Sequence, residues 1–282
     1  MTGADRARRH TRYFLDWSRG AAPVHLGADV VMTGVQRHRA AARERGASYS
    51  VVSYLLYAGA RVLAAHPEAN AGAAGRLLPR TVRHDRVHAK LALDRDTPHG
   101  RAVHTAVLRD ADRLGLPALQ RLVDRCRDAP LEELPGAAGV RLLDRLPPPL
   151  GRLAFRAAVA RPGRRADLLG TFSVSSLGHR RVDTFHSYGG TAVTLTAGRI
   201  APRPVAGPAG TTTVPVLRLG LTFDHRVIDG AAAADVLEEI VQLLEACDAA
   251  LPGGWDDPRH PLDGPGQADP ADRAGGPLAV LP

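Results

Sequence analysis

The sequence predicts an α/β fold (an α+β two-layer sandwich), in which a mixed sheet is covered by helices, and two patterns support this prediction. Segments in which apolar and polar residues alternate indicate half-buried strands, and they recur between residues 24 and 225. Other segments carry apolar residues three and four positions apart, as amphipathic helices do. Strands and helices combined in this way are typical of layered domains built on one sheet.

The first half of the chain is expected to hold four helices and three strands. It begins with a short basic and aromatic helix, a strand, a surface helix closed by Gly46, and a nearly apolar helix that Pro67 ends. Ser48 or Ser50 is the candidate cap of that apolar helix. Two alternating stretches separated by the turn sequence TPHG follow, and then an amphipathic helix. These elements are predicted at residues 6–17, 24–32, 33–46, 48–66, 86–96, 101–113 and 114–134.

The second half opens with residues 135–168, where Pro147–Pro149 interrupts the chain before a helical pattern resumes. Strands are then predicted at residues 171–178, 191–200 and 211–225, and a helix at residues 230–246. After Leu251 the sequence is dense in Pro, Gly and Asp and cannot bury enough apolar surface to offset its ordering entropy. We therefore expect one domain over residues 1–250 and a disordered or loosely attached tail over residues 251–282.

Composition limits the class of protein. The 282 residues are 44% hydrophobic, which allows a substantial core, but no run of eighteen apolar residues could span a membrane. The charged start lacks the apolar stretch of a secretory signal, so the expectation is a cytoplasmic protein with no membrane partner. The two cysteines, Cys126 and Cys247, are too few for a disulfide framework or a cysteine zinc site, and we expect no metal.

The net charge of +8 does not by itself indicate a nucleic-acid partner. Lys90 is the only lysine, and the arginines are scattered among acidic residues instead of forming a stripe with stacking aromatics. We therefore favour a protein that binds no nucleic acid. Some arginines remain candidates for contacts with phosphate groups of a small molecule, which suit planar guanidinium donors.

The strongest chemical signal is FDHRVIDGAAAADVLEE, residues 223–239. It places His225 at the end of a strand and Asp229 at the start of a helix. A neutral imidazole can act as general base near neutral pH. The alternative is structural: Asp229 is an ordinary helix cap, and an isolated histidine after a strand is usually a surface residue.

The His-x-x-x-Asp-Gly pattern at this junction resembles the signature of the chloramphenicol acetyltransferase fold. The longer string DHRVIDGAAAA is similar to the catalytic acyltransferase component of 2-oxoacid dehydrogenase complexes, and so are GTFSVSSLGHRRVDTF, residues 170–185, and the buried helix that ends in HPEAN. The strand pair DTPHGRAVHTAVLRDAD adds to the likeness, which covers roughly residues 6–248. The resemblance implies that residues 1–250 form an acyltransferase catalytic domain.

The resemblance also implies roles for individual residues. His225 would be the general base, and Ser175 would donate its hydroxyl to the oxyanion of the tetrahedral intermediate. Ser173 and Ser176 lie near enough to confuse the second assignment, and Ser175 could instead satisfy its own turn. His179 and His186, which follow the serine turn, could line the pocket or face solvent.

Further roles concern support of the site. Asp229, followed by Gly230, would hold the histidine loop by pairing with an arginine near the N-terminus, for which Arg8 and Arg9 are the candidates. The resemblance implies a homotrimer whose active sites lie between subunits. His225 and Ser175 would then meet from adjacent chains.

Three departures from the family pattern shape the expected function. The chain begins almost at the catalytic domain, without lipoyl or subunit-binding domains. HSYGGTAVTL stands where the family has an Asn-Pro-Pro stretch. Residues 135–168 are longer than the corresponding segment of the family and are candidates for a lid or an added interface. We therefore expect a stand-alone O-acetyltransferase that uses acetyl-CoA or an acyl-carrier thioester as co-substrate, without a permanently bound cofactor. The acceptor would be a hydroxyl of a small metabolite, such as a tetronate-type intermediate of antibiotic biosynthesis. The alternatives are a dihydrolipoamide or carrier-thiol acyltransferase and a catalytically silent trimeric scaffold.

Overall fold

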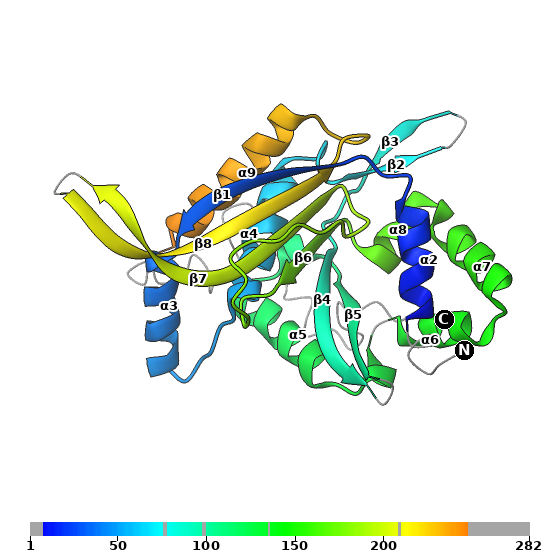
Figure 1. The fold of residues 1–282 in the computed structure, drawn as a ribbon, viewed down its shortest axis with the longest axis horizontal. Helices are drawn as coiled ribbons and strands as arrows, with labels where there is room; N and C mark the ends of the chain where they lie inside the picture. Colours follow the sequence, from blue (N-terminus) through cyan, green and yellow to red (C-terminus); the bar gives the residue numbers. More distant parts are fainter. Residues whose placement is uncertain (1–7, 76–77, 98–99, 135, 208–209, 248–282) are drawn as a thin grey trace.

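A computed structural model describes residues 8–75, 78–97, 100–134, 136–207 and 210–247 (Figure 1). Within these residues a sheet of six strands has the order β1-β8-β7-β6-β4-β5, and β2 and β3 form a separate hairpin. The α/β class with a mixed sheet is confirmed, whereas the predicted tail at residues 251–282 lies outside the described residues. The strands are β1 (Pro23–Val31), β2 (Ala71–Ala74), β3 (Arg80–Arg83), β4 (Ala89–Thr97), β5 (Gly100–Leu108), β6 (Phe172–Ser176), β7 (Val193–Gly207) and β8 (Gly210–Asp224).

The sheet is mixed because of one short strand. β6 runs parallel to both of its neighbours, β4 and β7, while β4–β5, β7–β8 and β1–β8 are antiparallel pairs. The predicted strand pair around TPHG is thus the β4–β5 hairpin. In Figure 1 the β7–β8 hairpin extends beyond the helices at the end of the sheet opposite α2.

One face of the sheet is apolar and carries the core. Alternate residues of β6 and β7, such as Phe172, Val174 and Leu195, are fully buried there. Helix α4 packs directly on them, since a Cβ added to Gly59 would lie 2.8 Å from the Phe172 ring. The helices on this side are α3 (Thr33–Glu44), α4 (Val51–Ala65), α5 (Leu116–Asp128) and α9 (Gly230–Glu245) (Figure 1).

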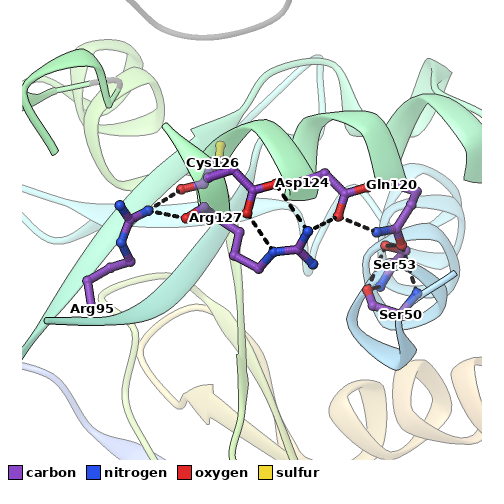
Figure 2. A network of polar contacts seen from close by, with 8 residues as sticks. Ser50, Ser53, Arg95, Gln120, Asp124, Cys126 and Arg127 are labelled. Atoms are coloured by element: carbon purple, nitrogen blue, oxygen red, sulfur yellow. Dashed lines mark hydrogen bonds and ion pairs between the residues drawn. The ribbon is translucent and has the colours of Figure 1, made fainter. Parts of the chain in front are cut away.

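Polar side chains lock α4 to α5 (Figure 2). Of the two candidate caps, Ser50 is the N-cap of α4, and its hydroxyl accepts a hydrogen bond from the Ser53 amide at 3.2 Å. The Gln120 side chain of α5 accepts from the Ser50 amide and from the Ser53 hydroxyl, both at 2.7 Å. Arg95 of β4 donates to the backbone carbonyl of Cys126 at 3.1 Å near the end of α5. These bonds join the start of α4 to α5 and the end of α5 to β4 of the sheet.

A second group of helices covers the opposite face at the β4–β5 end of the sheet (Figure 1). The predicted break at Pro147–Pro149 is confirmed as a helix boundary, because Pro148 opens the first turn of a new helix. The segment predicted at residues 135–168 thus forms three helices. The group consists of α2 (Arg9–Ser18), α6 (Ala137–Arg145), α7 (Pro148–Ala160) and α8 (Pro162–Leu169).

Two features differ from the sequence prediction. The helix predicted at residues 114–134 ends at Asp128, because Ala129 is extended before Pro130, and a single 3-10 turn, Leu131–Glu133, follows. The β2–β3 hairpin was not predicted, since its strands have only four residues each. None of the helices in the described part of the chain is long and apolar enough to cross a membrane.

Candidate active site

The sheet face beneath α2, α6, α7 and α8 is polar. Lys90, Ser173, Thr194, Thr222 and His25 pair directly across five strands, so they form one row on this face. The next row includes Ser175, Thr196 and Gly220. Because side chains alternate along a strand, the same strands present apolar residues to the core and hydroxyl or amino groups to the other side.

A cavity of about 820 Å³ lies between this polar face and the second group of helices. Its floor includes Lys90 and Ser175, and its roof includes Leu142 of α6 and Phe155 of α7. The volume falls within the range of small-molecule binding sites, which are commonly apolar with a few polar groups. The longer segment of the sequence, residues 135–168, therefore contributes most of the roof.

The structure distinguishes the three candidate serines. Ser173 is buried and shares a hydrogen bond of 3.1 Å with Thr191, while the Ser176 hydroxyl accepts from the Gly178 amide at 3.2 Å and so satisfies the turn. Ser175 lines the cavity, and within the described residues its hydroxyl makes no hydrogen bond. Ser175 is thus the serine whose hydroxyl is available to a ligand.

His225 lies at the end of β8, outside the cavity. Its backbone amide donates to the Ala22 carbonyl at 2.8 Å, which fixes the residue beside the start of β1. The ring is 47% exposed, and its Nδ1 lies 3.5 Å from the Asp229 carboxylate, too far for a good hydrogen bond. Within the described residues Nε2 has no hydrogen-bond partner, and about half of the side chain is exposed.

A single chain does not bring His225 and Ser175 together. Ser175 pairs across the sheet with Thr196, which pairs with Gly220, and His225 lies five residues beyond Gly220. At about 3.3 Å per residue, the two side chains are offset by roughly 17 Å along the strands, with β7 between them. A site that uses both residues requires a second copy of the chain.

The histidine loop is held by an ion pair that the sequence prediction missed. Asp224 is 2% exposed; its carboxylate accepts from the Arg226 guanidinium at 2.5 and 2.9 Å, from the Tyr188 hydroxyl at 3.0 Å and from the Ala22 amide at 3.3 Å. Burial acts to raise the pKa of Asp224, but hydrogen bonds and the charge of Arg226 outweigh it and lower the pKa. The available signal was an acidic residue at the end of a strand, two residues before an arginine.

The predicted pairing of Asp229 with Arg8 or Arg9 is wrong for a single chain. Arg9 instead donates to the backbone carbonyls of Asp144 and Leu146 at 2.8 and 3.1 Å, at the C-terminal end of α6, while Arg8 is the N-cap residue of α2. The Asp229 side chain is 90% exposed and approaches only His225 among the described residues.

Gly230 begins α9, and a Cβ added there would meet no atom within 4 Å. The chain itself therefore gives no steric reason for glycine at this position.

Of the other histidines, His179 approaches the Asp94 carboxylate at 4.0 Å, and the centre of the His186 ring lies 4.7 Å from the centre of the His25 ring. Neither His179 nor His186 lines the cavity.

Burial changes the electrostatics of the cavity. It lowers the pKa of Lys90 from 10.5 to about 8, and it also lowers the pKa values of His10 and His104, whose rings are 6.0 Å apart. Both imidazoles therefore favour the neutral form at neutral pH, whereas the Lys90 amine keeps most of its charge. The cavity combines apolar walls with one buried cationic group, Lys90, while Arg141 and Arg164 also line it and are exposed.

Part of the sequence is similar to known proteins. The family model described as 2-oxoacid dehydrogenases acyltransferase (catalytic domain) matches residues 163–251. Over 50 residues the chain is 46% identical to the dihydrolipoyllysine-residue acetyltransferase component of the pyruvate dehydrogenase complex of Bacillus subtilis, and 44% identical to that of Staphylococcus aureus. The aligned segment covers 18% of this chain and 11% and 12% of those two proteins, about a tenth of their length.

Solved structures share the fold over most of the chain. The cubic core of the pyruvate dehydrogenase multienzyme complex is 26% identical, with a TM-score of 0.59 and coverage of 85% of this chain and 86% of that one. A probable dihydrolipoamide acetyltransferase from Listeria monocytogenes is 19% identical, with a TM-score of 0.62 and coverage of 86% and 92%. Azotobacter vinelandii dihydrolipoamide acetyltransferase is 24% identical, with a TM-score of 0.61 and coverage of 84% and 86%.

The class of fold is therefore the one that this chain shares with solved dihydrolipoamide acetyltransferases and with the core of the pyruvate dehydrogenase complex. Within this class, the chain is related to the catalytic domain of the 2-oxoacid dehydrogenase acyltransferases, in sequence over residues 163–251 and in fold over most of its length.

Proposed function

We propose that this chain transfers an acetyl or short acyl group from acetyl-CoA, or from an acyl-carrier thioester, to a hydroxyl of a small metabolite. The observation that carries the proposal is the Ser175 hydroxyl, which opens into the cavity without a hydrogen-bond partner among the described residues. A hydroxyl in this state can be aimed at developing negative charge without first breaking an existing bond. A tetronate-type intermediate with a primary hydroxyl is one acceptor of this kind.

The reaction needs no covalent enzyme intermediate. His225 accepts the proton of the acceptor hydroxyl on Nε2 as the oxygen attacks the thioester carbonyl carbon. The carbonyl oxygen becomes an oxyanion, to which Ser175 donates its hydroxyl proton in a hydrogen bond. The carbon–sulfur bond then breaks, the thiolate leaves with the proton from the imidazolium, and the ester remains. Asp224 and Arg226 act as positioning residues, because they hold the loop that carries His225.

The active site would be formed between subunits of a homotrimer. The separation of His225 and Ser175 within one chain supports this arrangement, since no acceptor oxygen could touch both. The exposed His225 ring would face the cavity mouth of the next copy. A closed cyclic assembly would repeat this contact at every interface.

A similar set of residues is named for a relative. A serine, a histidine and an asparagine are named in the catalytic mechanism of Azotobacter vinelandii dihydrolipoamide acetyltransferase, where the asparagine follows the histidine by four positions. In this chain Asp229 stands four positions after His225. We infer that His225 and Ser175 hold the corresponding roles and that Asp229 takes the place of the asparagine.

A second candidate is transfer between coenzyme A and a dihydrolipoamide or carrier-protein thiol. The identity of 46% over 50 residues to a dihydrolipoyllysine-residue acetyltransferase component favours this candidate. The cavity roofed by residues 137–169 favours a small acceptor that enters between helices and sheet, because it offers a small-molecule volume beside Ser175. A catalytically silent scaffold would have no need of an unpaired Ser175 hydroxyl.

The proposal is tested by measuring the rate of thiol release from acetyl-CoA in the presence of hydroxylated metabolites or of dihydrolipoamide. His225→Ala should lower transfer by about 10²- to 10⁴-fold, the usual contribution of a general base. His179→Ala is the matched control, because His179 is a surface histidine outside the cavity, and it should retain full activity. Transfer to dihydrolipoamide alone would favour the second candidate. A wild-type rate equal to the buffer rate with every acceptor would favour the scaffold.

Ser175 and Ser176 form a second matched pair. Ser175→Ala should lower kcat on the order of 100-fold with little change in KM, because an oxyanion donor acts in the transition state. Ser176→Ala removes a turn hydrogen bond and should leave kcat within about threefold, a loss smaller than 1 kcal/mol. Equal effects of the two substitutions would remove Ser175 from the oxyanion role.

A further inference from the structure

Lys90 occupies an unusual position on the floor of the cavity. It lies in β4, paired with Ser173 of β6, and its side chain is directed to the polar face of the sheet. The residue is 5% exposed, and its Nζ lies 4.9 Å from the centre of the Phe14 ring of α2. The amine is therefore enclosed between the sheet and a roof helix, in the same cavity as Ser175.

Among the described residues, no carboxylate balances the charge of this amine. An ammonium group has three donors, and the Gly189 carbonyl is the hydrogen-bond acceptor found among the described residues. None of the described carboxylates forms an ion pair with it, and burial alone lowers its pKa. Buried charges are normally paired because an isolated one is costly. An anion that enters the cavity would supply the missing partner.

The rest of the cavity is suited to an apolar body. Leu142 and Leu143 of α6, and Phe155 and Val159 of α7, contribute to its roof. Nδ1 of His10, which also lines the cavity, is buried without a hydrogen-bond partner among the described residues. Lys90 is buried, whereas the other cations that line the cavity, Arg141 and Arg164, are exposed. A single buried cation in a mainly apolar enclosure matches an organic monoanion better than a phosphate, which usually requires several donors.

We propose that the cavity binds an amphipathic organic monoanion, whose acidic group pairs with Lys90 and whose apolar body lies beneath α6 and α7. This inference rests on the proposed function in one respect: since Ser175 lines the same cavity, the monoanion is the acyl acceptor, and its hydroxyl lies near Ser175. The acceptor class is then a hydroxylated acid with an apolar chain. Lys90 selects acceptors that carry an acidic group and takes no part in proton transfer.

Calorimetric titration of the full-length chain with decanoate and with decanol tests the proposal without any thioester chemistry. Decanoate should bind about 10- to 100-fold more tightly than decanol, the usual gain from a charge-assisted hydrogen bond. Lys90→Met should remove this preference by weakening decanoate while leaving decanol unchanged. Arg218→Met is the matched control, because it removes a surface cation that pairs with Asp29, and it should change neither affinity.

A variant at the roof tests the location of the ligand. Leu142 is 59% exposed, so Leu142→Trp should be tolerated by the fold while it narrows the cavity and weakens both ligands. Equal affinities of the wild type for decanoate and decanol, or no saturable binding of either, would overturn the proposal. These outcomes are separate from the activity test: a wild type that binds decanoate through Lys90 but transfers no acyl group would refute the proposed function alone.

Discussion

The two faces of the sheet are built from the same strands but serve different purposes. On one face Phe172, Val174 and Leu195 pack against α4 with no exposed surface. On the other face Ser175 and Lys90 line a cavity of about 820 Å³ beneath α2, α6, α7 and α8. Close packing on one face therefore stabilises the strands strongly enough for the other face to keep unpaired polar groups and open space.

The largest expected difference between the faces concerns packing. Leu195→Ala on the closed face should lower the free energy of unfolding by about 3–5 kcal/mol, because it leaves a cavity in a close-packed core. Leu142→Ala in the roof should cost less than about 1 kcal/mol, because that side chain is mostly exposed beside existing open space. Denaturant unfolding of both variants measures the difference. Similar losses would mean that the roof is packed as tightly as the core.

Next in size is the effect at the ion pair that holds the histidine loop. Asp224→Ala should cost about 3 kcal/mol, because it leaves the Tyr188 hydroxyl and the Arg226 guanidinium without their buried acceptor. Asp29→Ala removes a similar Asp–Arg pair, with Arg218 at 3.2 Å on the surface, and should cost less than about 1 kcal/mol. A small loss at Asp224 would show that the loop is held by other contacts.

The same carboxylate gives an acid dependence. Since the folded state lowers the pKa of Asp224, its contribution to stability is present above the unfolded pKa near 3.8 and is lost as the pH falls below it. Between pH 5 and pH 2 the stability gap between wild type and Asp224→Ala should therefore narrow. A gap that is constant over this range would contradict the lowered pKa.

Lys90 gives an effect in the alkaline range. Its folded pKa of about 8 lies below the ordinary 10.5, so between these values the unfolded chain binds more protons and wild-type stability rises with pH. The gain relative to Lys90→Met should be about 3 kcal/mol between pH 7 and pH 10.5, since one pKa unit is worth about 1.4 kcal/mol. Thermal or urea unfolding of both proteins at several pH values measures it, and parallel curves would refute the burial of a charged amine.

The sequence predicts most of this architecture but not the contents of the cavity. Alternation in TFSVSSLG and TAVTLTAGRI locates β6 and β7, and the motif around His225 indicates the candidate base, because both signals are local. Which side chains share the polar face depends on the register of strands distant in sequence, so the position of Lys90 in the same cavity as Ser175 could not be read from the chain.

Pairing between loops was equally beyond sequence reasoning. The sequence predicts Arg8 or Arg9 as the partner of Asp229, but Arg9 donates to carbonyls at the end of α6, because the fold of residues 137–146 decides where α2 lies. Asp224 and Arg226 are close in sequence, but the Tyr188 hydroxyl that completes their network comes from a loop 36 residues earlier. Polar networks that join separate loops become visible only with the tertiary structure.

The central claim is that His225 of one chain acts with Ser175 of another, and complementation between two inactive variants tests it most directly. His225→Ala and Ser175→Ala chains, co-expressed with different tags and purified as mixed assemblies, would contain interfaces with both residues intact. In a cyclic trimer every mixed assembly has one interface of three with both residues intact, so about a third of the wild-type activity should return. Mixed assemblies as inactive as either parent, alongside an active wild type, would contradict an active site shared between chains.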